Sequence, residues 1–193
     1  MKYREFSNLG WKVSEIGIGC WAIGSEWGDV SPENAKDALF TSLDNGVNFF
    51  DTADVYGDGR SEKSIGEILK NTKEKIYVAT KAGRRLDPHV SEGYNIKNIE
   101  AFIDRSLLNL GIDTIDLLQL HCPPSDICGK SETYEMMDEI VKKGKIKYYG
   151  VSVEKVSEAL DAIKFPNVKS IQIIFNIFRQ KPNEIFFKEA KKN

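Results

Sequence analysis

Four polar residues in this 193-residue chain have the types needed to reduce a carbonyl group. Hydride addition leaves an alkoxide that needs a proton, and Tyr56 offers a weakly acidic hydroxyl whose ordinary pKa is about 10. An ammonium beside the phenol favours the tyrosinate left after proton donation, and a carboxylate keeps that ammonium charged and in place. Lys81 and Asp51 suit these two roles, and His121 could hydrogen-bond the substrate carbonyl.

Each of these residues also has an ordinary explanation when it is taken alone. Lys81 could be a solvated strand end, Tyr56 a loop aromatic, Asp51 a turn residue or cap, and His121 a packed histidine. Their positions favour a shared role, because Asp51, Lys81 and His121 each stand at or just beyond an apolar run typical of a buried strand. In a parallel barrel all strands end at one face. We therefore predict that the four side chains converge in one catalytic site.

The elements that would position these residues alternate between apolar runs and amphipathic stretches. A short hairpin is predicted first, with strands at 3–7 and 11–15 around Asn8-Leu9-Gly10. Six buried strands follow, at 16–19, 47–50, 76–80, 115–120, 146–151 and 170–175. Helices are predicted after them, with Ser31 and Ser131 as caps, Gly46, Gly111 and Gly144 as ends, and the remaining helices at 60–69, 154–164 and 182–192.

This alternation predicts parallel strands joined by right-handed crossovers, and therefore the α/β class. The segment Gly17-Ile-Gly19-Cys-Trp-Ala22 also matches the GxGxxA fingerprint of an open Rossmann sheet. In a true fingerprint the helix begins inside the glycine loop, whereas the next cap in this chain is Ser31. A TIM-type (β/α) barrel with an N-terminal hairpin is therefore preferred, and the open sheet is the alternative.

The residues around Tyr56 closely resemble the active-site signature of aldo-keto reductases. The matching segments are Phe49-Phe-Asp-Thr-Ala-Asp-Val-Tyr-Gly57, Gly59-Arg60-Ser61-Glu62, Thr80-Lys81, Leu118-Gln-Leu-His121, Gly150-Val-Ser152 and Ile171-Gln172. The resemblance covers essentially the whole chain. It implies a TIM-type barrel with a leading hairpin that binds NADPH in an extended form, without a Rossmann domain, and reduces aldehydes or ketones to alcohols.

The resemblance also implies roles for individual residues. Asp51, Tyr56, Lys81 and His121 match the catalytic tetrad, with Tyr56 as the acid. Ser152 and Gln172 match the residues that hold the nicotinamide carboxamide, and Gly19, Trp21 and Asp51 are placed with them on the cofactor side. Val153 stands where the family commonly has asparagine, which removes one amide contact.

The substrate pocket is expected to lie between Tyr56, His121 and the loop after the first barrel strand. That loop carries Trp21 and Trp27, which are plausible pocket walls, although ordinary packing at the rim explains the two indoles equally well. Which carbonyl compound binds stays open, because pocket shape in this architecture comes largely from loops.

Composition bounds the partners and the compartment. The net charge of -2 and the pI near 5.8 give no basic surplus, so a small molecule is favoured over nucleic acid or a membrane. The charged start at residues 1–6 does not suit a signal peptide, and no apolar run approaches the roughly 20 residues of a membrane span, so a cytoplasmic protein with reduced thiols is expected. A metal site at His121, Cys122 and Cys128 is disfavoured, because no second ligand pair has a metal-binding spacing.

The length predicts a barrel that cannot close. A barrel of eight strands takes about 250 residues, so residues 1–193 are predicted to form a single incomplete domain with about six of the eight units. By the resemblance, the two absent units carry the NADP phosphate contacts. Open strand edges would then invite self-association. Two alternatives to a working reductase stay open: a non-catalytic, nucleotide-binding regulatory member, and an inactive fragment.

Overall fold

The computed structural model describes residues 1–6, 9–24 and 28–192. The chain begins with the predicted hairpin, in which β1 (Tyr3–Phe6) pairs antiparallel with β2 (Trp11–Ser14). Six parallel strands follow in the sheet order β3-β4-β5-β6-β7-β8. Their bounds are β3 (Ile18–Gly19), β4 (Phe49–Asp51), β5 (Tyr77–Ala82), β6 (Ile115–His121), β7 (Ile146–Val153) and β8 (Val168–Ile173).

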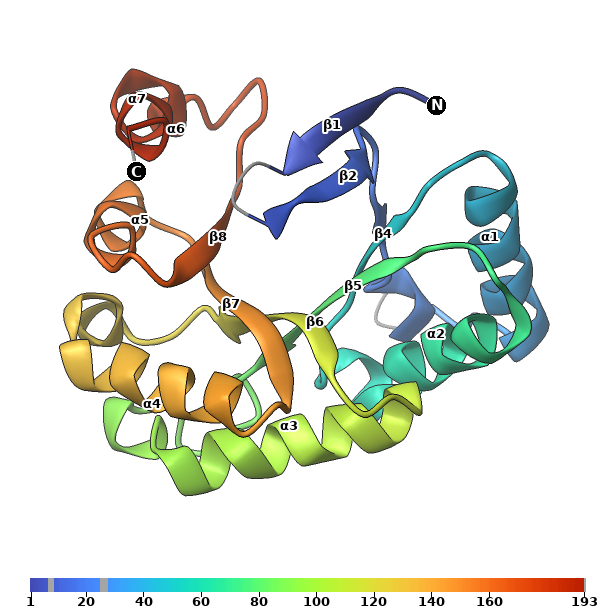
Figure 1. Cartoon of the computed structure of the whole chain (residues 1–193), viewed down its shortest axis with the longest axis horizontal. Coiled ribbons are helices and arrows are strands. Elements are labelled where there is room, and N and C mark those ends of the chain that lie inside the picture. The colour runs from blue at the N-terminus through green and yellow to red at the C-terminus, as the bar shows by residue number, and fades with distance from the viewer. Residues whose placement is uncertain (7–8, 25–27, 193) are drawn as a thin grey trace.

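The helices lie along the outside of this curved sheet (Figure 1), so the chain has the architecture of a half-barrel. They are α1 (Pro32–Asp44), α2 (Arg60–Asn71), α3 (Ile96–Leu110), α4 (Ser131–Lys142), α5 (Val156–Ala162), α6 (Lys181–Glu184) and α7 (Phe186–Ala190). The prediction of a TIM-type α/β fold with a leading hairpin and about six of eight units is confirmed. The strands β3 and β8 are the two edges of the sheet.

Local chemistry explains where α1 begins and where α3 ends. The hydroxyl of Ser31 accepts a hydrogen bond from the Asn34 amide at 3.1 Å and caps α1 as predicted. Gly111 ends α3 with φ of 65°, a left-handed conformation that glycine adopts without strain. The predicted cap at Ser131 is wrong, because Lys130 occupies that position and Ser131 is already the first residue of α4.

The last predicted helix, at 182–192, is also wrong as a single element. It is divided into α6 and α7 at Ile185, whose φ of -129° does not fit a helix. The open-sheet alternative fails at the other end of the chain. After β3 comes a short 3-10 turn, η2 (Ala22–Gly24), and α1 begins only at Pro32, so no α-helix starts within the glycine motif.

The hairpin covers the end of the half-barrel where the parallel strands begin. Trp11 stacks on Tyr77 with ring centres 4.5 Å apart and meets Tyr148 edge to face at 5.5 Å. Leu9, Trp11, Ala79 and Leu117 form the buried cluster inside this end. The larger core lies on the outer side, between the sheet and its helices. The carboxyl ends of the strands are therefore the end at which polar side chains can meet a ligand.

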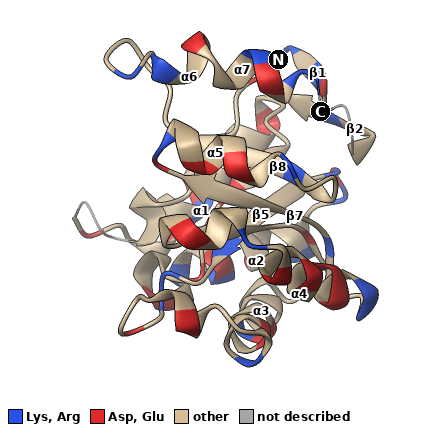
Figure 2. Cartoon of the chain, turned by 90° about the vertical axis from the view of Figure 1, so that its left-hand side faces the viewer, with Lys and Arg blue, Asp and Glu red and all other residues tan. Residues whose placement is uncertain are grey.

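Charged residues of both signs are mixed over the surface (Figure 2), and an exposed apolar segment lies near the carboxyl end of the chain. Figure 2 shows basic and acidic residues mixed on the outer helices rather than gathered by sign. Among the described residues, no helix combines the length and the apolar character that crossing a membrane requires. Beyond the edge strand β8, Ile177 and Phe178 are 80% and 88% exposed, which makes this segment the most apolar exposed stretch of the described chain.

Candidate active site

Strand pairing places the predicted site residues on one face of the sheet, near the carboxyl ends of its strands. Gly19 lies opposite Asp51 between β3 and β4, and His121 lies opposite Ser152 between β6 and β7. Ser152 in turn lies opposite Gln172 on β8. Since cross-strand partners point to the same face, these side chains share the inner face of the half-barrel. The same argument includes Lys81, which is two residues beyond the partner of Asp51, Ala79.

Lys81 and Asp51 form a direct ion pair on this face. The Lys81 ammonium donates to Asp51 Oδ1 at 2.7 Å and to the main-chain oxygen of Thr52 at 2.7 Å. The lysine side chain is 2% exposed and the aspartate side chain 20%. A buried ammonium is stable only with such partners, so the pair fixes the position of Lys81 Nζ.

Tyr56 and His121 lie beside this ion pair. Tyr56 opens a 3-10 turn, η3 (Tyr56–Gly59), directly after β4 and its short loop. Lys81 Nζ is 5.3 Å from the centre of the Tyr56 ring, and the rings of Tyr56 and His121 meet edge to face with centres 5.8 Å apart. All four members of the predicted tetrad are thus within one small space at the carboxyl ends of β4, β5 and β6.

The loop that presents Tyr56 is held by a close backbone approach and by two arginines. Gly57 has φ of 57°, and a Cβ there would lie 2.5 Å from the main-chain oxygen of Gly24, so no larger residue fits. Asp58, with φ of 55°, is bound by Arg85 at 2.7 Å and by Arg105 at 2.6 Å. These contacts join the Tyr56 loop to the segment after β5 and to α3.

A buried polar network supports the strand ends from behind. The Thr52 hydroxyl lies 2.8 Å from that of Ser61, which donates to the main-chain oxygen of Cys20 at 2.9 Å. Glu62, fully buried in α2, accepts from the Thr80 hydroxyl at 2.6 Å and from the Asn109 amide at 2.9 Å. The serine and glutamate of the signature segment therefore position the strand ends rather than face the mouth.

Asp54 is the least satisfied group near the site. It is fully buried, and neither carboxylate oxygen accepts a hydrogen bond of good geometry from the described residues. Burial raises the pKa of Asp54 to about 7, and the neighbouring Glu62 carboxylate contributes to the increase, while Arg85 and Arg105 oppose the shift. Asp54 therefore changes its protonation near neutral pH, unlike an ordinary surface aspartate.

The two ring groups of the site carry shifted pKa values. Burial raises the pKa of the Tyr56 hydroxyl well above its ordinary range, the Asp51 carboxylate adds to the increase, and Arg84 opposes it. Burial lowers the pKa of His121 to about 3, with further decreases from the cations of Lys81 and Arg84. At neutral pH the site therefore contains a protonated phenol and a neutral imidazole. The sequence led us to expect that Lys81 makes the phenol more acidic, whereas burial and the Asp51 carboxylate raise the pKa of Tyr56.

Ser152 and Gln172, which are predicted to hold the cofactor, have polar groups that are available for hydrogen bonds. The Ser152 hydroxyl has one recorded neighbour, the Cys122 thiol at 4.0 Å, and the Gln172 amide makes no hydrogen bond within the described residues. Both groups are therefore free to bind a carboxamide. Val153 is buried in the core and offers no polar contact there. Ser152 and Gln172 therefore have hydrogen-bonding groups available for a ligand at the ends of β7 and β8.

The two tryptophans predicted for the pocket are placed less fully. Trp21 follows β3 and is 42% exposed, so its indole stands at the rim of the mouth. Trp27 lies outside the described residues. Their role as pocket walls stays a prediction.

The cysteines are buried or half-buried, and all are free thiols. Burial raises the pKa of Cys20 and of Cys128 to about 12, and it also raises the pKa of Cys122. All three therefore stay protonated at neutral pH. Within the described residues, no group of three or more histidine, cysteine or carboxylate side chains is arranged to hold a metal ion.

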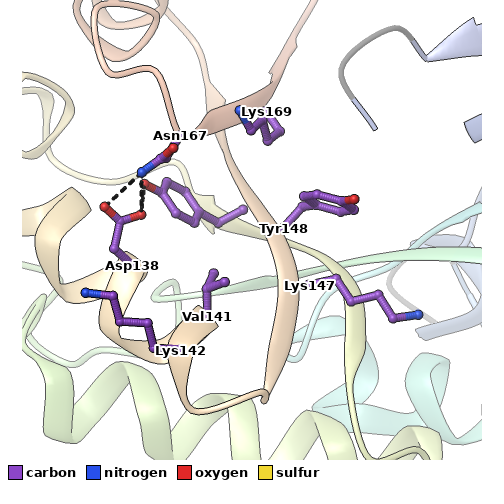
Figure 3. Close-up of a pocket in the computed structure, with 8 residues that line it drawn as sticks. Asp138, Val141, Lys142, Lys147, Tyr148, Asn167 and Lys169 are labelled. Carbon is purple, nitrogen blue, oxygen red and sulfur yellow. Dashed lines mark hydrogen bonds between the residues drawn. The ribbon is translucent and has the colours of Figure 1, made fainter. Parts of the chain in front are cut away.

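The hollow in Figure 3 lies at α4, the start of β7 and the segment before β8, away from the tetrad, and has a volume of about 430 Å³. The Asn167 amide donates to both oxygens of Asp138 at 3.1 Å, and the Tyr149 hydroxyl donates to the same carboxylate at 2.7 Å. Because these polar groups satisfy one another, they join α4 to β7 and β8. None of the predicted site residues lines this hollow.

Sequence reasoning missed three residues that shape the site. Asp54, Asp58 and Arg85 lie in or next to the segments quoted for the chemistry, but their types alone do not reveal a role. Asp58 follows a glycine in a short loop, which is a signal for a left-handed turn residue. The choice of Arg85 rather than its neighbour Arg84 as partner of Asp58 depends on the fold and has no signal in the sequence.

Comparison with known proteins gives matches over most of the chain. Residues 15–193 match the model of the aldo/keto reductase family. An uncharacterised oxidoreductase of Bacillus subtilis strain 168 is 34% identical over 188 residues, which make up 95% of this chain and 59% of the relative. An aldo-keto reductase of Schizosaccharomyces pombe whose name specifies NADP(+) is 32% identical over 175 residues, 86% of this chain and 50% of the relative.

A solved structure gives the same result for the fold. An aldo-keto reductase from Bacillus halodurans, in its holo form, superposes with a TM-score of 0.84 at 30% identity. The superposition covers 99% of this chain and 63% of the other. The chain thus spans less than two thirds of the length of each of these three proteins.

Proposed function

Because the chain belongs to the aldo/keto reductase family, we propose that the whole protein reduces aldehydes or ketones to alcohols with Tyr56 as the general acid. The observation that carries the proposal is the meeting of Tyr56 and His121 beside the Lys81–Asp51 ion pair. Each group matches one need of carbonyl reduction, and fold alone would not support the assignment, since TIM-type barrels host many reactions.

Tyr56 supplies the proton. Its raised pKa keeps the hydroxyl protonated at neutral pH, so the phenol is ready to donate when negative charge develops on the carbonyl oxygen. The tyrosinate left after donation lies beside the Lys81 ammonium, 5.3 Å from the ring centre, which lowers the energy of the charged product. Asp51 holds Lys81 in that position through the contact of 2.7 Å.

His121 orients the carbonyl group. A neutral imidazole can donate one hydrogen bond to a carbonyl oxygen without competing with Tyr56 as an acid. Its pKa of about 3 keeps the ring neutral throughout the physiological range. Tyr56 and His121, whose ring centres are 5.8 Å apart, are close enough for both to hydrogen-bond the same carbonyl oxygen.

NADPH, when bound, supplies the hydride. Ser152 and Gln172 would hold the carboxamide of its nicotinamide at the ends of β7 and β8, and Gly19, with no side chain, leaves room beside Asp51. Trp21 stands at the rim, where an indole could cover the ring or the substrate. The preference for NADP over NAD rests on the relative from Schizosaccharomyces pombe, whose name carries NADP(+).

The test is an NADPH titration of the purified protein followed by addition of a simple aldehyde. Quenching or enhancement of NADPH fluorescence together with loss of NADPH absorbance would support a reductase. Binding without turnover would indicate a regulatory member of the family, and it would reject the proposal. If NADPH does not bind, residues 1–193 are an inactive fragment that cannot hold the cofactor.

A further inference from the structure

A second polar recess lies beside the tetrad, on the same mouth of the half-barrel. It has a volume of about 300 Å³ and is lined by residues that follow three successive strands. Arg84 comes after β5, Cys122 and Ser125 after β6, and Lys155 after β7. Cys122 directly follows His121, so this recess begins where the carbonyl site ends.

Arg84 is the cation of this recess whose charge is not already neutralised. It is exposed, and within the described part of the chain it has no carboxylate within 4.0 Å and no hydrogen bond. The adjacent Arg85 is bound to Asp58 at 2.7 Å. Lys155, on the far side, is bound to Glu158 at 3.3 Å and to the Ser125 hydroxyl at 2.9 Å.

The Arg84 charge acts on the reaction site itself. Arg84 lowers the pKa of both Tyr56 and His121, and it acts on Cys122 as well. Glu154, which among the described residues is the one carboxylate of the recess without an ion pair, raises the pKa of Cys122 but does not contribute to the shifts of Tyr56 or His121. Because Arg84 and Cys122 line the same recess and Cys122 directly follows His121, the other end of a substrate held by the tetrad can extend toward the Arg84 guanidinium.

Building on the proposed function, we propose that Arg84 binds a carboxylate on the substrate, so that the preferred substrates are aldehydes or ketones that carry an acid group. A guanidinium binds a carboxylate through two parallel hydrogen bonds, which fixes orientation as well as position. Since Arg84 is the one cation of this recess without a partner among the described residues, and Glu154 also lines it, the recess suits a monoanion better than a doubly charged phosphate. Arg84 follows Lys81 by three positions, so their Cα atoms are at most about 10 Å apart. A benzene ring or a short carbon chain can therefore join the carbonyl group of the substrate to its carboxylate.

The experiment compares two aldehydes of the same shape, 4-carboxybenzaldehyde and its neutral amide 4-formylbenzamide, as substrates of the whole protein with NADPH. We expect kcat/KM to be at least about tenfold higher for the acid. Arg84→Gln should lower kcat/KM for the acid by about ten- to a hundredfold, chiefly through KM, and change that for the amide less than about twofold. Because Arg84 is exposed and has no partner among the described residues, this variant should fold normally.

Lys155→Gln is the matched control. It also removes one positive charge from this recess, but that charge is already neutralised by Glu158. It should change kcat/KM for both aldehydes less than about twofold. Equal losses for acid and amide in Arg84→Gln, or equal losses in the two variants, would overturn the Arg84 subsite while leaving the reductase intact. Reduction of neither aldehyde would instead remove the proposed function, and the subsite with it.

Discussion

The Lys81 ammonium and the Asp51 carboxylate meet at 2.7 Å, although 30 residues separate them in the chain. They come from neighbouring strands β4 and β5, and the lysine is almost completely buried. Their contact holds Lys81 Nζ in place beside the Tyr56 ring, 5.3 Å from its centre.

Breaking this ion pair should cost stability that a second substitution partly restores. Lys81→Met leaves Asp51 as an uncompensated charge, and because that side chain is 20% exposed we expect a loss of about 1–3 kcal/mol in the free energy of unfolding. Adding Asp51→Asn should recover at least about 1 kcal/mol of this loss. Urea denaturation of the two single variants and the double variant measures the coupling.

Lys147 provides the control for that experiment. Its contact with Asp116 is also 2.7 Å, but the lysine side chain is 47% exposed. Lys147→Met should therefore cost less than about 1 kcal/mol. Additive losses in the Lys81 and Asp51 variants would contradict the assigned pair.

Asp54 should make stability fall as pH rises. Its pKa is about 7 in the folded protein, above an ordinary value near 4, so the folded state holds the proton more tightly between these values. The associated stabilisation is present below about pH 4 and is lost as pH rises to about 7. Asp54→Asn removes this dependence, so its free energy of unfolding relative to the wild type should rise by about 1–3 kcal/mol between pH 5 and pH 8.

Urea denaturation of both proteins at the two pH values measures that difference. Glu62, Arg85 and Arg105 are unchanged in the variant, so their contributions cancel in the comparison. A difference between variant and wild type that does not change with pH would show that Asp54 is ionised throughout.

His121 should show no ionisation between pH 5 and pH 8. Its pKa of about 3 in the folded state lies below the ordinary value near 6.5, so folding favours the neutral ring, and the stability that this provides is lost as pH falls below about 6.5. Carbon-13 NMR of the imidazole carbons follows each ring separately. His89 is the internal comparison, since it is exposed and its pKa is lowered without a large shift. An inflection for His121 near pH 6.5 would reject the neutral imidazole.

Particular residues show how far the sequence leads. The hairpin and all six strands could be predicted from the sequence. Short apolar runs bounded by glycines or charged residues are typical of buried strands. The carboxyl ends of β4, β5 and β6 were predicted too early, since Asp51, Lys81 and His121 are themselves part of these strands. A polar residue does not mark the end of a strand when its side chain belongs to the site at that end of the sheet. The end of β8 was predicted too late, since the strand ends at Ile173 rather than at 175.

Other features of the site could not be predicted because they depend on which charges meet in space. Arg84 and Arg85 are identical in type and adjacent, yet one binds Asp58 and the other has no partner among the described residues. The same limit applies to Asp54, whose complete burial depends on how the folded chain packs around it. The predicted Ser131 cap was wrong for a simpler reason. The helix α4 already includes Ser131, so the capping position falls on Lys130.

The central claim is that Tyr56 donates the proton, and replacing its hydroxyl tests it most directly. In the whole protein, Tyr56→Phe should lower kcat by at least about a hundredfold, because the proton donor is lost, while the dissociation constant of NADPH measured by fluorescence changes less than about twofold. The aromatic ring remains to pack against His121, so folding should be unaffected. A Tyr56→Phe variant that keeps more than about a tenth of the wild-type kcat would contradict the account.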